Sequence, residues 1–177
     1  MRRKTEEVEV NVELGKSGEI DTGDKVLDHL LVTLLFYAGM EATISARGDL
    51  PHHLWEDTGI TLGRALKSRV ADENIARYGT AIMPMDDALI LASVDVSRSY
   101  LSVDLSVQEE ETGFSLTLYR EFLRGLVREL GLTLHIVQLN GVNAHHVLEA
   151  VCKAFGSALL HALSSADELR STKGILR

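Results

Sequence analysis

The sequence predicts an α+β fold of the α/β-sandwich type, built from two similar halves, and three observations lead to this fold class. Strand-like and helix-like segments follow one another in the order strand, helix, strand, helix, and this order occurs twice. The last helix of each half begins with the same motif, His-His-x-x-Glu, at residues 52–56 and 145–149. A chain of 177 residues with two prolines and no linker rich in Gly, Ser or Pro has the size of one closely packed unit. We therefore expect a single compact unit of two tandem repeats, at approximately residues 1–82 and 83–177.

The first half contains two strands and two helices by the periodicity of its apolar residues. Residues 8–14 alternate Val or Leu with Glu or Asn, which is typical of a half-buried strand. Residues 26–38 are apolar almost all round and of helical length, so this segment should lie buried between layers. Residues 41–47 read as a second strand, and the helix that begins at the first motif is expected to continue to Val70.

The second half repeats this order. Residues 87–105 are rich in β-branched side chains and predict strand structure, with a turn near residues 97–99. Apolar residues recur at helical spacing from Leu118 to Leu130. Residues 133–139 predict a strand, and the second motif then opens a helix with an apolar stripe.

Composition and charge exclude several classes of partner. The formal net charge of −8 argues against nucleic acid or an anionic membrane, because both reward a basic surface. The longest nearly apolar run, residues 30–40, is too short to cross a bilayer, and no apolar segment of a signal peptide follows the basic residues near Met1. Cys152 is the only cysteine, so no internal disulfide can form. We therefore expect a cytoplasmic protein that binds neither nucleic acid nor membrane.

The paired motif indicates a metal site. Residues four apart on a helix share a face, so His52 and Glu56 can approach one ion. Adjacent residues differ by about 100° around the helix, so His53 should serve a different ion from His52. A single motif of this kind is most simply a solvated helix end, but two copies at equivalent places favour metal binding. Imidazole and carboxylate together suit Mn²⁺, Fe²⁺, Co²⁺ or Zn²⁺.

Alignment of the two halves adds one ligand to each. His29 lies ten residues before Gly39, and Glu121 lies ten residues before Gly131. Each glycine precedes the strand that leads to a motif, so His29 and Glu121 are repeat equivalents, and both are metal-ligand types. About four ligands per ion would leave open positions for water or substrate. The eight candidate ligands are His29, His52, His53, Glu56, Glu121, His145, His146 and Glu149.

The chain resembles the imidazoleglycerol-phosphate dehydratase family of histidine biosynthesis from about Arg3 to Leu176. The order of the matching motifs is specific, although no single motif is. The segments that carry the resemblance are residues 21–29, 52–63, 76–79, 84–89, 131–135, 143–155 and 171–176.

The resemblance implies a fold, a reaction and an assembly. The fold is a duplicated α/β unit, similar to domain 2 of ribosomal protein S5, with a four-helix layer between two four-stranded mixed sheets. The enzyme is a hydro-lyase that converts D-erythro-imidazole glycerol phosphate to imidazole acetol phosphate in L-histidine biosynthesis. It uses two Mn²⁺ per active site, with other divalent transition metals as alternatives. Family members form a 24-subunit shell with sites at subunit interfaces.

The resemblance also implies roles for individual residues. Glu7 takes part in proton transfer and contacts the substrate. Glu56 and Glu149 join it as catalytic carboxylates that also hold metal. Taken alone, each of the matching basic residues would be a solvated surface charge. The residues that grip the substrate phosphate correspond to Arg77, Arg98, Ser171 and Lys173.

Four departures from the family pattern keep other functions open. The departures are Glu121 where the family normally has histidine, Leu50-Pro51 in place of acidic residues, Ser97-Arg98-Ser99-Tyr100 in place of Ser-Gly-Arg-Pro-Tyr, and Thr33 in place of Gln. One alternative is a divergent metal-dependent lyase or hydrolase that acts on another small phosphorylated compound. The other is a non-catalytic shell protein whose subunits are joined by metal.

Overall fold

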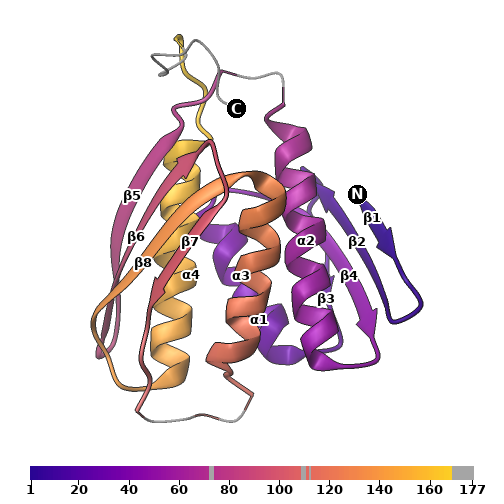
Figure 1. The fold of residues 1–177 in the computed structure, drawn as a ribbon, viewed down its shortest axis with the longest axis horizontal. Helices are drawn as coiled ribbons and strands as arrows, with labels where there is room; N and C mark the ends of the chain where they lie inside the picture. The colour runs from indigo at the N-terminus through magenta and orange to yellow at the C-terminus, as the bar shows by residue number, and fades with distance from the viewer. Residues whose placement is uncertain (72–73, 109–110, 112, 169–177) are drawn as a thin grey trace.

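Four helices lie between two four-stranded sheets in the computed structural model, which describes residues 1–71, 74–108, 111 and 113–168 (Figure 1). One sheet has the strand order β1-β2-β4-β3 and the other has the order β5-β6-β8-β7. The predicted sandwich with a helical layer between two mixed sheets is therefore confirmed.

The first sheet is formed by β1 (Arg2–Lys4), β2 (Val8–Leu14), β3 (Ile20–Asp21) and β4 (Ala42–Gly48). Strand β2 runs antiparallel to β4 with Val12 opposite Ile44, and the short β3 runs parallel to β4. Val10 and Val12 are fully buried, because the apolar face of β2 packs against the helices.

The second sheet repeats this arrangement with β5 (Tyr78–Met85), β6 (Ala88–Val96), β7 (Tyr100–Asp104) and β8 (Leu132–Asn140). A hairpin again forms one edge, the two middle strands are antiparallel, and the last strand, β7, is parallel to β8. The described residues of the two halves therefore have the same strand order and the same strand directions.

The helices are α1 (Lys25–Tyr37), α2 (Pro51–Arg69), α3 (Leu116–Leu130) and α4 (Ala144–Ala162). They pack in two pairs, α2 with α3 and α1 with α4. A Cβ atom added at Gly59 of α2 would lie 2.1 Å from the carbonyl oxygen of Phe122 on α3, and one added at Gly156 of α4 would lie 2.5 Å from the carbonyl oxygen of Leu34 on α1. Glycine at these crossings lets the paired backbones touch.

The starts of the helices are defined by local side chains. Asp24 caps α1, and its second carboxylate oxygen accepts a hydrogen bond from the indole of Trp55 on α2 at 2.9 Å. Asn143 caps α4 by accepting the backbone N–H of His146. Helix α2 begins with Pro51 in its first turn, a position where the missing N–H has no cost. Both His-His-x-x-Glu motifs therefore occupy the first turns of their helices.

The strands and helices predicted from periodicity are present, but three short or exposed strands were not expected. Strands β1 and β3 have too few residues for an alternation to be recognised. The side chains of strand β5 alternate between an inward and an outward face, but the inward face carries Gly79 while the outward face carries the apolar Ile82, so residue type does not reveal the buried face. The division of the chain near residues 82 and 83 stays a prediction, and β5 runs across it. No helix in the described part of the chain is long and apolar enough to cross a membrane.

Candidate metal centre

Three candidate ligands from different parts of the chain converge between α1 and α4. His145 and Glu149 lie one turn apart on α4, and His29 faces them from α1. His29 Nε2 lies 2.9 Å from Glu149 Oε2, and His145 Nε2 lies 3.0 Å from the same oxygen. One ligand atom from each residue lies within 4.8 Å of the others. We call His29, His145 and Glu149 the first ligand group, and its donor atoms suit a divalent transition metal.

The carboxylate of Glu149 is ionised over a wide pH range. Burial opposes ionisation, but hydrogen bonds from Lys153 and His29 outweigh it and lower the pKa of Glu149 to about 2. Lys153 Nζ donates to Oε1 at 2.9 Å, whereas Oε2 faces the histidines. One oxygen is thus held by the protein while the other is directed into the ligand group.

An aromatic side chain covers one side of the first ligand group. The ring of Phe114 stacks on that of His145 with 4.4 Å between centroids, and its edge approaches His29. Glu111 Oε1 lies 3.5 Å from the Nδ1 atom of His145. Phe114 therefore covers one face of the His145 imidazole.

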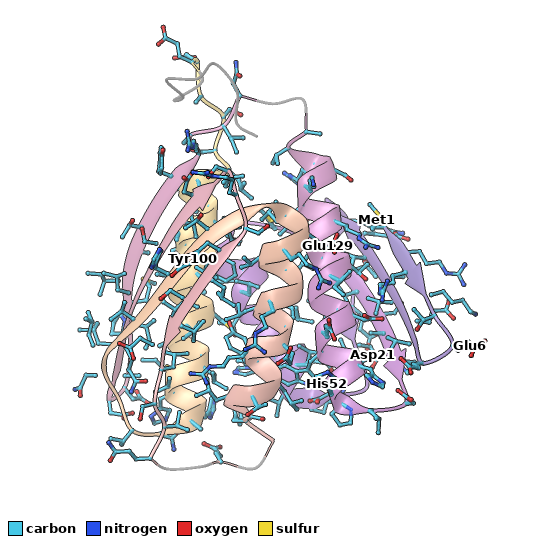
Figure 2. The ribbon with its side chains drawn as sticks, in the orientation of Figure 1. Met1, Glu6, Asp21, His52, Tyr100 and Glu129 are labelled. Atoms are coloured by element: carbon cyan, nitrogen blue, oxygen red, sulfur yellow. The ribbon has the colours of Figure 1, made fainter. Side chains whose placement is uncertain are left out.

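The repeat equivalents of these residues are His52, Glu56 and Glu121, which we call the second ligand group. His52 Nε2 lies 3.7 Å from Glu56 Oε2 in the first turns of α2. Glu121 lies on α3 one turn before Gly125, where an added Cβ would lie 2.7 Å from the carbonyl oxygen of Glu56. The Glu121 carboxylate is paired with Arg124 one turn further along α3. Among the described residues, the groups whose ligand atoms all lie within 4.8 Å of one another do not include this one, so the second ligand group does not converge as the first does. Figure 2 shows His52 at the lower end of the helical layer, on the side of α2.

The second histidine of the first motif faces a different set of acids. His53 Nδ1 lies 2.8 Å from Asp49 Oδ1 and 3.8 Å from Glu7 Oε2. The hydrogen bond to Asp49 raises the pKa of His53 against a smaller opposing effect of burial. Glu7, Asp49 and His53 also form a group in which one ligand atom from each lies within 4.8 Å of the others. His52 and His53 therefore have different partners.

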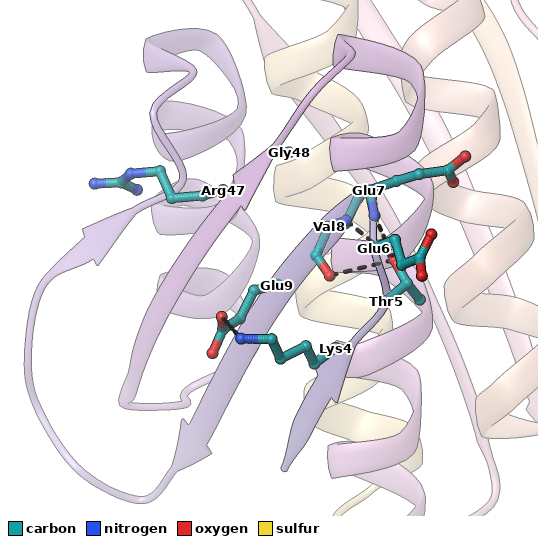
Figure 3. Close-up of a pocket in the computed structure, with 8 residues that line it drawn as sticks. All are labelled: Lys4, Thr5, Glu6, Glu7, Val8, Glu9, Arg47 and Gly48. Atoms are coloured by element: carbon teal, nitrogen blue, oxygen red, sulfur yellow. Dashed lines mark hydrogen bonds and ion pairs between the residues drawn. The ribbon is translucent and has the colours of Figure 1, made fainter.

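Glu7 is carried by the turn between β1 and β2, which is held by the Thr5 side chain. The backbone N–H groups of Glu7 and Val8 donate to the Thr5 hydroxyl at 3.2 and 3.0 Å. The turn borders a pocket lined by Lys4–Glu9, Arg47 and Gly48 (Figure 3). Figure 3 shows the Glu7 side chain directed away from Arg47.

The second histidine of the second motif contacts the turn between β5 and β6. His146 Nδ1 lies 2.5 Å from Asp87 Oδ1, and Nε2 lies 3.3 Å from Asp86 Oδ2. The hydrogen bond to Asp87 raises the pKa of His146 and lowers that of Asp87. Asp86 has a φ of 47°, a left-handed conformation that an aspartate in a tight turn adopts more readily than most residues.

The predicted phosphate-binding arginines lie at the other end of the helical layer. The Arg77 backbone N–H donates to the carbonyl of Ala162 at the end of α4, seventeen residues after His145 and thus about 25 Å along the helix. The Arg77 guanidinium is paired with Asp95, with Nε 2.7 Å from Oδ1. Arg98 precedes β7, and its carbonyl accepts a hydrogen bond from Thr133 near the end of α3. Ser171 and Lys173 lie outside the described residues.

Four neighbours of the candidate ligands were missed by the sequence analysis. A sequence signal existed for Asp49, which stands four residues before His53, and for Lys153, which stands four residues after Glu149. No periodicity connects Asp87 with His146 or Phe114 with His145, because these pairs form only when the chain folds.

The fold and these side chains define a class of protein, a duplicated α/β sandwich whose paired helices present histidine and carboxylate groups suited to divalent metals. Comparison with known proteins identifies the family. The model of the imidazoleglycerol-phosphate dehydratase family matches residues 22–159, and the chain belongs to this family.

Similar proteins match over the full length of the chain. The imidazoleglycerol-phosphate dehydratase of Pyrococcus furiosus is 51% identical over 177 residues, which cover 99% of this chain and 100% of that protein. The protein of the same name from Dictyoglomus thermophilum is 42% identical, with 98% of this chain and 96% of that protein covered.

Two crystal structures have the same fold. The P. furiosus enzyme superimposes with a TM-score of 0.96 and covers 99% of this chain and 100% of that one, at 51% identity. The Staphylococcus aureus enzyme superimposes with a TM-score of 0.84 at 34% identity, and the match covers 94% of this chain and 98% of that one.

Proposed function

We propose that this protein is a hydro-lyase of histidine biosynthesis that removes water from imidazole glycerol phosphate to give imidazole acetol phosphate. The observation that carries the proposal is full-length membership of the family at 51% identity. The convergence of His29, His145 and Glu149 supports it, because a dehydratase of this kind needs a Lewis acid beside the substrate. We expect the enzyme to act in the cytoplasm.

We propose further that the site holds two Mn²⁺ ions, one at each ligand group. The first group brings its three donors within 4.8 Å of one another, and the second offers His52 and Glu56 at 3.7 Å, with Glu121 on the neighbouring helix. Three ligands leave positions open on an ion that takes six ligands. His53 and His146 contact acids outside the two ligand groups of their own chain, so we assign them to ions shared with neighbouring chains. Shared ions would place the sites at subunit interfaces, and we propose that the assembly is a 24-subunit shell.

The position of Arg77 assigns the phosphate and the imidazole of one substrate molecule to different chains. Arg77 lies about 25 Å along α4 from His145, too far for one substrate molecule to contact both in one chain. We propose that Arg77, Arg98, Ser171 and Lys173 of one chain bind the phosphate of a substrate whose imidazole lies at the ligand groups of another. Local cations of this kind give a chain of net charge −8 a binding site for an anionic substrate.

The reaction breaks one C–H bond and one C–O bond, and the enol that results tautomerises to the ketone. When Mn²⁺ is bound, it supplies Lewis acidity to the imidazole ring of the substrate. Glu7 is the group that we assign to the carbon-bound proton, since the Thr5 turn holds its backbone and its carboxylate lies 3.8 Å from His53. Glu56 and Glu149 contribute to catalysis because each places a negative charge beside the histidine of its ligand group, His52 or His145.

A coupled assay for imidazole acetol phosphate tests the proposal. Metal-replete protein should form product, lose activity on chelation, and regain it when Mn²⁺ is added. No product from metal-replete protein would contradict the dehydratase. Turnover of a different phosphorylated compound would indicate the divergent lyase or hydrolase. Dissociation on chelation without any turnover would indicate a metal-joined shell, which the position of Glu7 beside His53 does not favour.

A further inference from the structure

The second histidine of each motif is held at the same ring nitrogen by a carboxylate from outside the motif. Asp49 Oδ1 lies 2.8 Å from His53 Nδ1, and Asp87 Oδ1 lies 2.5 Å from His146 Nδ1. The first histidines differ, because His52 and His145 face the glutamate of their own motif through Nε2.

The two carboxylates do not come from equivalent positions of the repeat. Asp49 stands four residues before His53 and is adjacent to the start of α2, but the matching residue four before His146 is Val142. Asp87 instead reaches His146 from the turn between β5 and β6, 59 residues away in sequence. The equivalent turn of the first half, between β1 and β2, brings Glu7 Oε2 to 3.8 Å from His53 Nδ1, so the hydrogen-bonding carboxylate there is Asp49 instead. Both halves therefore place a carboxylate within hydrogen-bond reach of Nδ1, from different positions of the repeat.

Backbone hydrogen bonds hold both acids in place, in different ways. Asp87 Oδ2 accepts the N–H of Val142 at 2.7 Å, just before α4 begins, so the carboxylate itself is held. The backbone N–H of Asp49 donates to the carbonyl of Glu7 at 3.0 Å, which ties the main chain of this acid to the turn that carries the proposed proton-transfer residue.

We propose that Asp49 and Asp87 are positioning residues that prepare His53 and His146 to bind metal. An imidazole whose Nδ1–H donates to a carboxylate is fixed in one tautomer, with the Nε2 lone pair free for an ion and made more basic. This inference rests on the proposed function, since it assumes that His53 and His146 ligate the ions shared between chains.

The chain offers a charge control beside one of the two histidines. Glu6 is an exposed acid in the Thr5–Glu7 turn, and Glu6→Gln removes one negative charge from that turn without touching the Nδ1 hydrogen bond of His53. Asp86 does not serve as a control, because it lies 3.3 Å from His146 Nε2, the nitrogen that we assign to the ion.

Calorimetric titration of the full-length chain with Mn²⁺ is the test. Asp49→Asn and Asp87→Asn should each weaken binding at about half of the metal sites by roughly 10–100-fold, as for other acids that orient a ligating histidine. Asp49→Glu and Asp87→Glu should restore part of the loss. Thermal unfolding of the metal-free variants should match that of the metal-free wild type, which separates positioning from a loss of fold.

Three results distinguish the possible failures. Wild-type affinity in both asparagine variants would overturn the inference. An equal loss in Glu6→Gln would also overturn it, because net charge rather than histidine orientation would then govern binding. A wild-type chain that binds no Mn²⁺ would instead contradict the two-metal site of the proposed function before any variant is compared.

Discussion

Replacement of Gly59 by alanine should separate α2 from α3 and loosen the second ligand group. The new Cβ would lie 2.1 Å from the carbonyl oxygen of Phe122 and 3.1 Å from its Cα atom. Both atoms belong to the backbone, so no side-chain rotation can relieve the overlap. The helices must move apart by roughly 1 Å for the carbon and oxygen to reach van der Waals contact.

The magnitude follows from two opposing effects. Alanine favours a helix interior over glycine by about 0.5–1 kcal/mol. Overpacking of a well-packed core costs about 1–3 kcal/mol, and a clash with rigid backbone belongs near the upper end of that range. The net effect on the free energy of unfolding is a loss of about 1–2 kcal/mol.

Urea unfolding followed by the fluorescence of Trp55 provides the assay. Trp55 is the only tryptophan, lies on α2 four residues before Gly59, and is fully buried. The midpoint should fall at fixed protein concentration, with little change in the slope of the transition. Mn²⁺ binding by the second ligand group should weaken as well, because Glu121 is carried by α3 whereas His52 and Glu56 are carried by α2. A midpoint equal to or above that of the wild type would refute the backbone-contact reasoning.

Three further predictions concern proton transfer, an ion pair and the cysteine. Glu7→Gln should lower turnover by about 10²–10⁴-fold with Mn²⁺ binding retained in titration calorimetry, and near wild-type turnover would exclude Glu7 from proton transfer. Burial opposes ionisation of Asp95, but the hydrogen bonds from Arg77 outweigh it and lower the pKa of Asp95. The pair therefore stabilises the fold above the unfolded pKa of about 4 and loses this contribution as the pH falls through the folded value, so Asp95→Asn should flatten the acid limb of a pH–stability curve measured by urea unfolding. An unchanged acid limb would contradict this. Burial raises the pKa of the Cys152 thiol to about 12, so an aromatic disulfide reagent should label it at pH 8 only in urea, and rapid labelling of the folded chain would show that α4 opens.

Much of the secondary structure was predictable because periodicity records which face of each element is buried. The alternation in residues 8–14 and the helical spacing from Leu118 to Leu130 correspond to β2 and α3. Periodicity failed where an element was too short or carried apolar residues on both faces. Strand β3 has two residues, and β5 has Ile82 on its exposed face. Tertiary pairing, not local pattern, makes these segments strands.

The sequence by itself determined the duplication, the two His-His-x-x-Glu motifs and the repeat equivalence of His29 and Glu121. These properties depend only on residue types and on their spacing, and helix geometry converts spacing into a common face.

Only the tertiary structure decided which ligands meet. The pairing of α1 with α4 brings His29 to within 2.9 Å of Glu149, 120 residues away, and the β5–β6 turn brings Asp87 to His146. The fold also separates Arg77 from His145 by most of the length of α4. Such distances depend on how the buried faces pack, and the local spacing of residues carries no record of that packing.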